Sequence, residues 1–250
     1  ENLPTVALLS LCLDRHRAVA VAGWPSDDVL YSLRHQQLQP SHATIFKLMK
    51  AIDAEQSLDS FEHILSEDPL LAYRFLTYTN SAALGLRTGI DSLRRGLVML
   101  GYGTLQRWLG DQLPHASTDP NLSPIRQTMV LRAQLMERLV EAGIEYELRR
   151  EVYLTGLLSQ LDTLMDEPIA TILRRLPLSE RISDAIVLRS GPYAPALQIA
   201  CALETDDASV VRQLCETHEM DTESVNRALL RLLSELHVER PRPGQPTGSR

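Results

Sequence analysis

The sequence contains few lysines, cysteines, aromatic residues and glycines. Lys47 and Lys50 are the only lysines among 25 basic residues, and the three cysteines show no CxxC spacing. An odd number of cysteines in that arrangement gives no support to a disulfide framework or a zinc site. Aromatic residues make up 5% of the chain, whereas 44 residues are leucine. This composition disfavours an all-β protein, which is rich in aromatic and β-branched residues, and favours helices.

The chain also lacks a positive net charge and long apolar runs. Its formal net charge of −7 disfavours nucleic acids and anionic membranes as partners, because both attract basic surfaces. No apolar run is long enough to span a bilayer, and no signal peptide is recognisable. We therefore expect a cytoplasmic protein without a membrane partner. The first residue is Glu1 rather than methionine, which is consistent with a fragment of a longer protein.

The 250 residues fit one large domain or two small ones, and the pattern changes near residue 40. In residues 1–40, the apolar run from Arg17 to Pro25 predicts a buried strand, and Ser26 is a candidate N-cap for a short helix. We therefore predict a small α/β appendage. At the other end, the prolines and glycines of residues 239–250 predict a disordered tail.

Between these ends, apolar residues recur at spacings of three and four, which predicts an all-α domain over residues 41–238. A polar connection with two prolines, residues 115–124, divides this domain into two lobes of about 41–114 and 122–238.

Three local signals set helix boundaries within the predicted domain. Asp68 followed by Pro69 predicts a helix start, with an N-cap carboxylate and a proline at the first helical position. Gly101 is expected to close a later helix. The segment from Glu151 to Met165 is apolar on most of its circumference, which predicts one central, buried helix.

Several motifs follow one another in an order typical of a known family. Asp68-Pro69-Leu70-Leu71 precedes Asn80-Ser81-Ala82, and a helical block then ends in Leu100-Gly101. Further on, Gly156-Leu157-Leu158-Ser159-Gln160-Leu161-Asp162 is followed by Leu176-Pro177-Leu178-Ser179. This series resembles the HDOD domain, a helical relative of HD-type metal phosphohydrolases that serves as a signalling or output module. The second group is similar to the branch in which an EAL domain precedes the HDOD domain, so residues 1–40 could be an EAL-like remnant.

The resemblance also implies where a metal site would lie. The related enzymes use histidines and an adjacent His-Asp pair to hold metal ions that activate a water molecule. Here Ser159-Gln160 stands at the position of that pair, and no histidine occurs between His115 and His218. Asp162 is expected to cap or pair locally. We therefore predict no catalytic residue, no metal ligand and no cofactor, and a protein that is not an enzyme unless an upstream EAL domain supplies the activity.

Other motif residues have both a functional and a structural interpretation. Asn80 and Ser81 could belong to a recognition surface, or they could satisfy backbone groups at a helix end. The pairs Arg94-Arg95 and Arg149-Arg150 could bind a phosphate or an acidic partner. Equally, they could lie on solvated helix faces and pair with nearby carboxylates.

The resemblance leads to one main functional hypothesis. We expect a non-catalytic bacterial signal-transduction module that binds signalling proteins, with a link to cyclic di-GMP regulation of motility or stress responses. Its helical surface and the groove between the lobes would provide the binding sites, and a homo-oligomer is compatible with the sequence. The alternative is a divergent HD-type metal-dependent phosphohydrolase or phosphodiesterase.

Overall fold

The computed structural model describes residues 4–16, 18–19, 23–84, 89–140, 146–205 and 207–238. Within these ranges the regular elements are helices, and strand-like pairing is limited to an isolated bridge between Ser41 and Ser117. The predicted all-α class is therefore confirmed. The predicted disordered tail, residues 239–250, lies outside the described residues.

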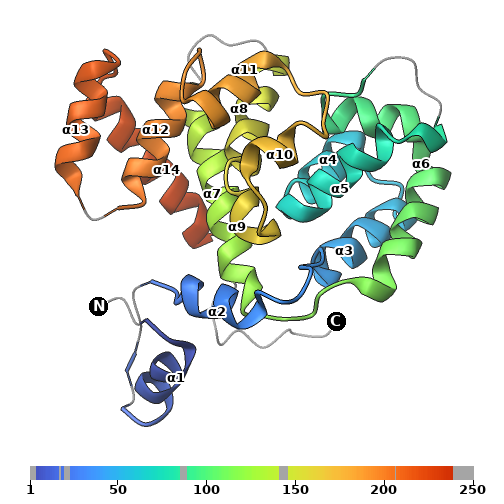
Figure 1. Cartoon of the computed structure of the whole chain (residues 1–250), viewed down its shortest axis with the longest axis horizontal. Coiled ribbons are helices and arrows are strands. Elements are labelled where there is room, and N and C mark those ends of the chain that lie inside the picture. Colours follow the sequence, from blue (N-terminus) through green and yellow to red (C-terminus); the bar gives the residue numbers. More distant parts are fainter. Residues whose placement is uncertain are drawn as a thin grey trace, which may run out of the picture.

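Most of the helices form two adjacent groups, which we name the first and second lobes (Figure 1). The first lobe contains α3 (His42–Asp53), α4 (Leu58–Leu65), α5 (Pro69–Thr79), η1 (Ala82–Leu84), α6 (Leu93–Gln112) and η2 (Leu113–His115). The second contains α7 (Leu122–Leu139), α8 (Tyr146–Leu158), α9 (Leu161–Met165), α10 (Ile169–Leu173), α11 (Glu180–Ser183), η3 (Asp184–Leu188), α12 (Ala194–Leu203), α13 (Ala208–Thr217) and α14 (Thr222–Val238).

Short polar side chains determine where the helices of the first lobe begin. The Oγ atoms of Ser41 and Ser57 accept hydrogen bonds from the backbone N–H groups three residues later, at the starts of α3 and α4. Asp68 caps α5, and Pro69 occupies the first turn of that helix. These are the interactions that satisfy N–H groups without an intrahelical partner.

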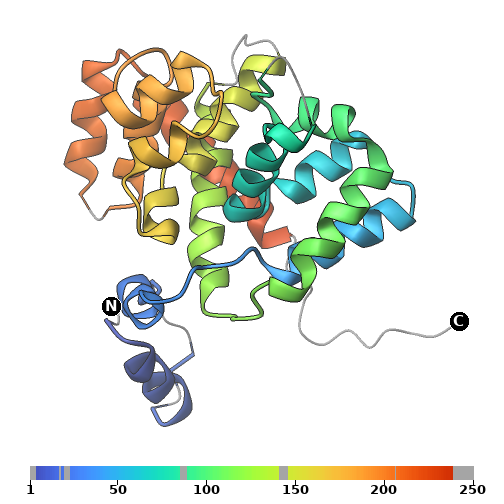
Figure 2. The ribbon, with the colours of Figure 1, turned by 45° about the vertical axis from the view of Figure 1, so that its right-hand side comes forward.

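One continuous apolar core joins the two lobes. Phe75 of α5, Met136 of α7, Leu157 of α8 and Leu197 of α12 are all completely buried within it. Helix α7 runs between the two groups of helices (Figure 2) and packs closely against α8. At Gly156 of α8 the backbones are so close that an added Cβ would lie 2.6 Å from the Cα of an α7 residue.

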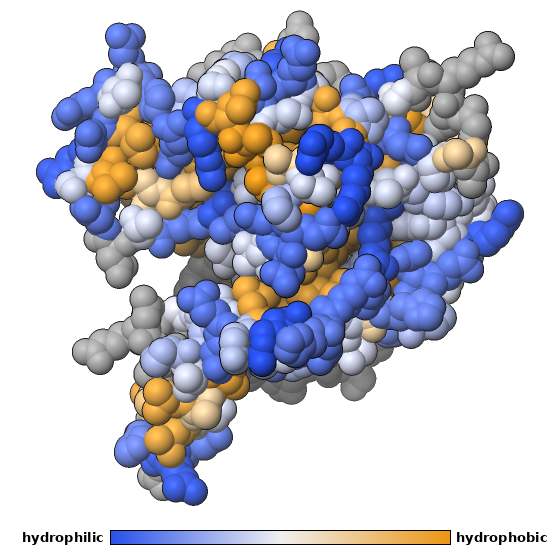
Figure 3. All heavy atoms as spheres, viewed as in Figure 1, coloured by the Kyte–Doolittle hydropathy of each residue, from blue (hydrophilic) through white to orange (hydrophobic). Residues whose placement is uncertain are grey.

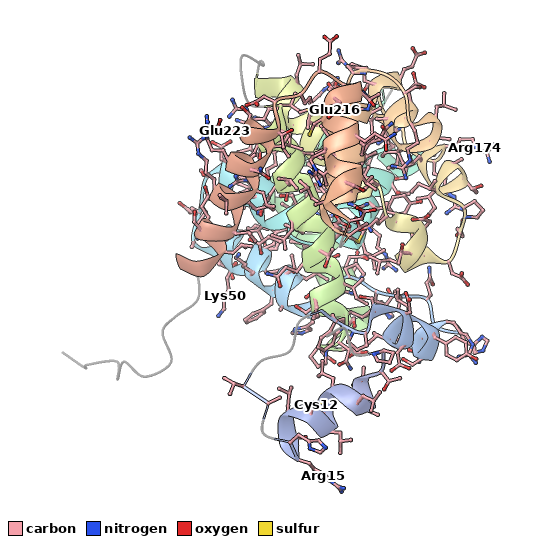
Figure 4. The ribbon with its side chains drawn as sticks, turned by 90° about the vertical axis from the view of Figure 1, so that its left-hand side faces the viewer. Cys12, Arg15, Lys50, Arg174, Glu216 and Glu223 are labelled. Carbon is pink, nitrogen blue, oxygen red and sulfur yellow. The ribbon has the colours of Figure 1, made fainter. Side chains whose placement is uncertain are left out.

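Two helices, α1 (Val6–Asp14) and α2 (Ser26–Leu33), precede the first lobe. Figure 4 shows α1, marked by Cys12 and Arg15, lying below the helical body. None of the residues of α1 is buried, whereas α2 buries Val29. The Trp24 indole donates a hydrogen bond to the Asn121 carbonyl oxygen at 3.1 Å, which fastens this segment to the start of α7.

The strand predicted from Arg17 to Pro25 is wrong where the structure describes this run. Residues 18–19 and 23–25 belong to no strand, and the other residues of the run lie outside the described ranges. An apolar run shows only that side chains prefer to be buried. A strand also needs a neighbouring strand to pair its backbone groups, and the described part of residues 1–40 forms helices instead.

One predicted helix boundary is confirmed and another is wrong. Gly101, with φ of 68° and ψ of 165°, ends one helical segment, and a second segment follows it after a kink within α6. The helix predicted from Glu151 to Met165 is divided into α8 and α9. At the break, the Ser159 Oγ donates a hydrogen bond to the Gly156 carbonyl oxygen at 2.8 Å. Such a bond competes with the continuation of a helix.

No helix in the described part of the chain combines the length and the hydrophobicity that crossing a bilayer requires.

Candidate functional site

Asp68 joins three parts of the fold through one buried carboxylate. Its Oδ1 accepts hydrogen bonds from the backbone N–H groups of Leu70 and Leu71, at 2.9 and 3.1 Å, and its Oδ2 accepts one from Ser41 N at 2.6 Å. The buried Arg126 of α7 places its Nε 3.7 Å from Oδ2. The Asp-Pro motif therefore connects the starts of α3 and α5 with α7, and its role here is positional.

Asn80 fixes the chain after α5. Its Nδ2 donates hydrogen bonds to the carbonyl oxygens of Leu76 and Ile90, both at 2.8 Å, and its Oδ1 accepts one from Ile90 N at 2.7 Å. These contacts agree with the structural interpretation of the residue. The neighbouring Ser81 has a buried Oγ without a hydrogen-bond partner among the described residues.

Ser159 and Gln160 face a guanidinium group contributed by α7. Arg132 Nη1 donates a hydrogen bond to Ser159 Oγ at 3.0 Å. With its amide oxygen turned toward Arg132, Gln160 accepts from Nη2 at 2.6 Å. Arg132 also forms a bidentate pair with Glu204 at the end of α12, at 2.7 Å for Nε–Oε1 and 2.5 Å for Nη2–Oε2. Burial acts to lower the pKa of Arg132, but the hydrogen bonds to Glu204 and the attraction of nearby acidic groups outweigh it, so the pKa is raised.

This arrangement does not fit a metal ion at Ser159-Gln160. A hydroxyl and a neutral amide are weak ligands for divalent cations, and the guanidinium of Arg132 places a fixed positive charge against both. Asp162 accepts a local hydrogen bond from Thr163 N at 3.0 Å. Within the described ranges, no group of three or more His, Cys, Asp and Glu side chains is arranged to hold a metal.

A pocket of about 390 Å³ lies between the lobes, and we name it the interlobe pocket. Arg150 of α8 pairs with Glu62 of α4 and places its Nη2 3.5 Å from Asp59 Oδ1. Arg94 of α6 pairs with the same two carboxylates. The pocket is lined by side chains of α4, α6, α7 and α8 and of the residues directly after α4 and before α6: Asp59, Glu62, His63, Ser66, Asp91, Ser92, Leu93, Arg95, Glu137, Arg150, Glu151, Tyr153 and Leu154.

The two members of each arginine pair, Arg94-Arg95 and Arg149-Arg150, lie in different surroundings. Arg94 and Arg150 meet at Glu62, whereas Arg95 bonds to Asp91 at 2.7 Å on the solvated rim of the interlobe pocket. Arg149 does not line this pocket, and its buried Nε has no hydrogen-bond partner among the described residues. The structure therefore brings together one residue of each pair.

Glu62 is the buried acid of this pocket, with 6% of its surface exposed. Burial raises its pKa above the ordinary value of 4.5, and attraction to Arg150 and Arg94 opposes that effect without cancelling it. A raised pKa means that the folded protein binds this proton more tightly than the unfolded chain does. Its contribution to stability is therefore complete below pH 4.5 and is lost as the pH rises through the folded-state pKa.

We predict that Glu62→Gln removes this pH dependence. The free energy of unfolding of the wild type should fall relative to that of Glu62→Gln as the pH rises above 4.5. Urea unfolding of both proteins across this pH range measures the difference. The control is Glu223→Gln, which replaces an exposed carboxylate paired with Arg227. Its free energy of unfolding should change with pH in parallel with that of the wild type. If the wild type instead became more stable relative to Glu62→Gln as the pH rose, the raised pKa of Glu62 would be contradicted.

Sequence reasoning missed Arg132, Glu204, Glu62 and Asp59. Arg132 and Glu204 are 72 residues apart, and no local motif links them. A usable signal was the presence of charged residues at apolar positions of predicted helices, since a buried charge needs a partner.

The fold and the site define a two-lobed, all-α domain with a charged pocket between its lobes. The chain belongs to the HDOD family: the model of the HDOD domain matches residues 38–166, about half of the chain. The resemblance stated from the motifs is thereby confirmed, and the chain carries a domain of signalling proteins.

Two curated relatives are similar to this chain over 200 residues each. One is the cyclic di-GMP phosphodiesterase CdgJ of Vibrio cholerae, 24% identical over 79% of this chain and 46% of that protein. The other is the uncharacterized protein YuxH of Bacillus subtilis, 22% identical over 77% of this chain and 47% of that protein. The chain spans about half the length of both relatives.

Among solved structures, the MmoQ response regulator of Methylococcus capsulatus has a similar fold. The TM-score is 0.61 at 16% identity, covering 77% of this chain and 98% of that chain. A second structure, of a fragment of the same regulator, gives a TM-score of 0.59 at 14% identity, covering 76% and 94%. These likenesses support the all-α fold.

The expectation that this chain is not an enzyme was wrong. The relative from Vibrio cholerae is named a cyclic di-GMP phosphodiesterase, which is an enzyme. The expectation depended on one position, Ser159-Gln160, and on the histidines missing near it. The chemistry of one pair of side chains does not determine what the rest of a longer protein catalyses.

Proposed function

We propose that this chain is a cytoplasmic signalling module that binds a partner protein at the interlobe pocket, in a pathway linked to cyclic di-GMP. The carrying observation is the ion-pair network of that pocket, where Arg150 of the second lobe meets Glu62 and Asp59 of the first. Membership in the HDOD family and the name of the Vibrio relative support the signalling context.

The network suits signal transmission because its members come from both lobes. A partner that inserts a charged side chain at the rim would compete with existing pairs, such as Arg95 with Asp91. Exchange of exposed or half-buried ion pairs involves small free energies, typically below about 1 kcal/mol. The pair of Arg150 with the exposed Asp59 joins the two lobes, so competition at Asp59 would let a partner shift the relation between the lobes without unfolding either one.

The test is co-purification from cells that naturally express the gene, with three forms of the chain as bait. Arg95→Glu reverses a charge on the pocket rim, and Arg107→Glu reverses one on the exposed face of α6, outside the pocket. We expect one protein to be retained by the wild type and by Arg107→Glu and lost with Arg95→Glu. The cellular cyclic di-GMP concentration should change with Arg95→Glu as it does on deletion. Equal retention by all three forms would contradict the proposal.

Hydrolysis of cyclic di-GMP by the protein that contains this chain is a second candidate, favoured by the name of the Vibrio relative. Incubation of the purified chain with cyclic di-GMP and added manganese, followed by chromatography of the products, tests it directly. Linear dinucleotide or GMP would support this candidate for residues 1–250, and unchanged substrate would remove it for this part of the protein.

A further inference from the structure

A second, larger cavity lies away from the interlobe pocket, between α2, α5 and α9. We name it the α2–α5 cleft, and its volume is about 1350 Å³. On the face seen in Figure 3, hydrophobic side chains form the floor of a hollow between α2 and α9, and hydrophilic side chains surround it. Ligand pockets for small molecules usually measure about 300–1,000 Å³. This cleft has room for a segment of polypeptide.

The floor of the cleft is apolar and partly aromatic. The Tyr78 ring stacks on the Trp108 ring, with centroids 5.7 Å apart. Tyr73 and Leu70 of α5 and Leu164 of α9 contribute buried surface, and Met165 is half-buried at the edge. Aromatic side chains together with methionine are typical of the centres of protein interfaces.

Two polar groups in this cleft are poorly satisfied. Arg74 Nη1 donates to the neutral Gln112 Oε1 at 3.1 Å, and no carboxylate of the described residues lies within 4.0 Å of its guanidinium. Asp68, at the start of the same helix, attracts it only from a greater distance. Ser81 Oγ, one turn beyond Tyr78, is buried and has no hydrogen-bond partner among the described residues. Both residues line the cleft.

Other arginines of this chain show how a satisfied guanidinium behaves. Arg132, Arg94 and Arg181 each lie beside a carboxylate, and their pKa values are raised. Burial instead lowers the pKa of Arg74, because the loss of water is not compensated by a neighbouring anion. Arg74 is half-buried. A half-buried charge without a close counter-ion loses part of its hydration, and a carboxylate supplied by a ligand would offset that cost.

We propose that the α2–α5 cleft binds a short segment of a partner protein that carries one acidic side chain flanked by apolar side chains. The carboxylate pairs with Arg74, and the apolar side chains cover Tyr78 and the neighbouring floor. This deepens the proposed function, on which it rests, by naming a docking site and the chemistry of its ligand. The site is separate from the interlobe pocket, since the two cavities have no lining residue in common.

The test is selection of short random peptides displayed on phage, with the full chain as target. The most enriched peptide is then synthesised with a fluorescent label, and its affinity is measured by anisotropy. We expect enrichment of peptides with one Asp or Glu between aromatic or aliphatic residues. Arg74→Met, which keeps the aliphatic stem, should weaken binding about tenfold, the value of one charge-assisted hydrogen bond. Arg74→Lys should restore part of the affinity.

Two controls make the outcome decisive. Arg107→Met removes a charge from an exposed position outside the cleft and should bind as the wild type does. Circular dichroism and urea unfolding establish that the Arg74 variants remain folded. Absence of enriched peptides, or equal binding to Arg74→Met, would overturn the inference. If the peptides instead lose affinity with Arg95→Glu, the inference is wrong while the proposed function at the interlobe pocket stands.

Discussion

Replacement of Asp68 by alanine is expected to lower the free energy of unfolding by about 3–5 kcal/mol. The carboxylate has no exposed surface, and it accepts hydrogen bonds from Ser41, Leu70 and Leu71. Its removal leaves those three N–H groups without their acceptor and leaves Arg126 buried without a carboxylate. Each group left without its partner then costs the full desolvation penalty of a buried polar or charged group.

Urea unfolding of Asp68→Ala measures this loss, and two matched variants show its origin. Ser57→Ala removes an exposed N-cap of the same kind, at the start of α4. It should lower the free energy of unfolding by only about 1 kcal/mol. Arg126→Met together with Asp68→Ala removes both charges and should recover part of the stability. A loss for Asp68→Ala as small as that for Ser57→Ala would show that Asp68 acts as an ordinary cap.

Replacement of Gly156 by alanine is expected to lower the free energy of unfolding by about 3 kcal/mol, the upper part of the usual range for overpacking. The new Cβ would lie 2.6 Å from Ala133 Cα and 2.9 Å from Ala133 N. Backbone atoms cannot relieve such a clash by a change of rotamer, as a flexible side chain can. The change therefore forces α7 and α8 apart along the centre of the core.

Gly110→Ala is the control, and its expected sign is opposite. Nothing lies within 4 Å of a Cβ added at Gly110 in α6. Alanine favours the helix by about 0.5–1 kcal/mol relative to glycine, so this variant should be more stable than the wild type. Thermal and urea unfolding of both variants measure the contrast. Equal effects of the two substitutions would show that helix propensity, rather than the approach of α7, determines the role of Gly156.

The parts of the fold that could be predicted are those with local causes. A cap and the N–H groups that it satisfies lie within three residues, so Ser57, Asp68 and Pro69 determine helix starts by themselves. The all-α class followed from periodicity, which each segment shows on its own. The strand of residues 17–25 was not found where the run is described, because a strand depends on a neighbour that the run itself cannot reveal.

The candidate site could be predicted less well, for a physical reason. Motif order placed Ser159 and Gln160 at the position of the family's His-Asp pair, but it did not predict the helix break there or the partner Arg132, which comes from another helix. The interlobe pocket depends on Glu62 of α4 and Arg150 of α8, which meet only in the folded protein. Ion pairs between residues so far apart in the chain follow from tertiary structure, and no local sequence motif indicates them.

The continuity of the core determines how much chain is needed for folding. The match to the HDOD family ends at residue 166, yet α12 packs against α7, and α12 to α14 form a further apolar cluster with Leu139 at its edge. A chain that ended at 166 would expose this side of α7 to water and leave Arg132 without Glu204. We therefore expect a stable domain of this protein to extend to α14, well beyond the segment by which the family is recognised.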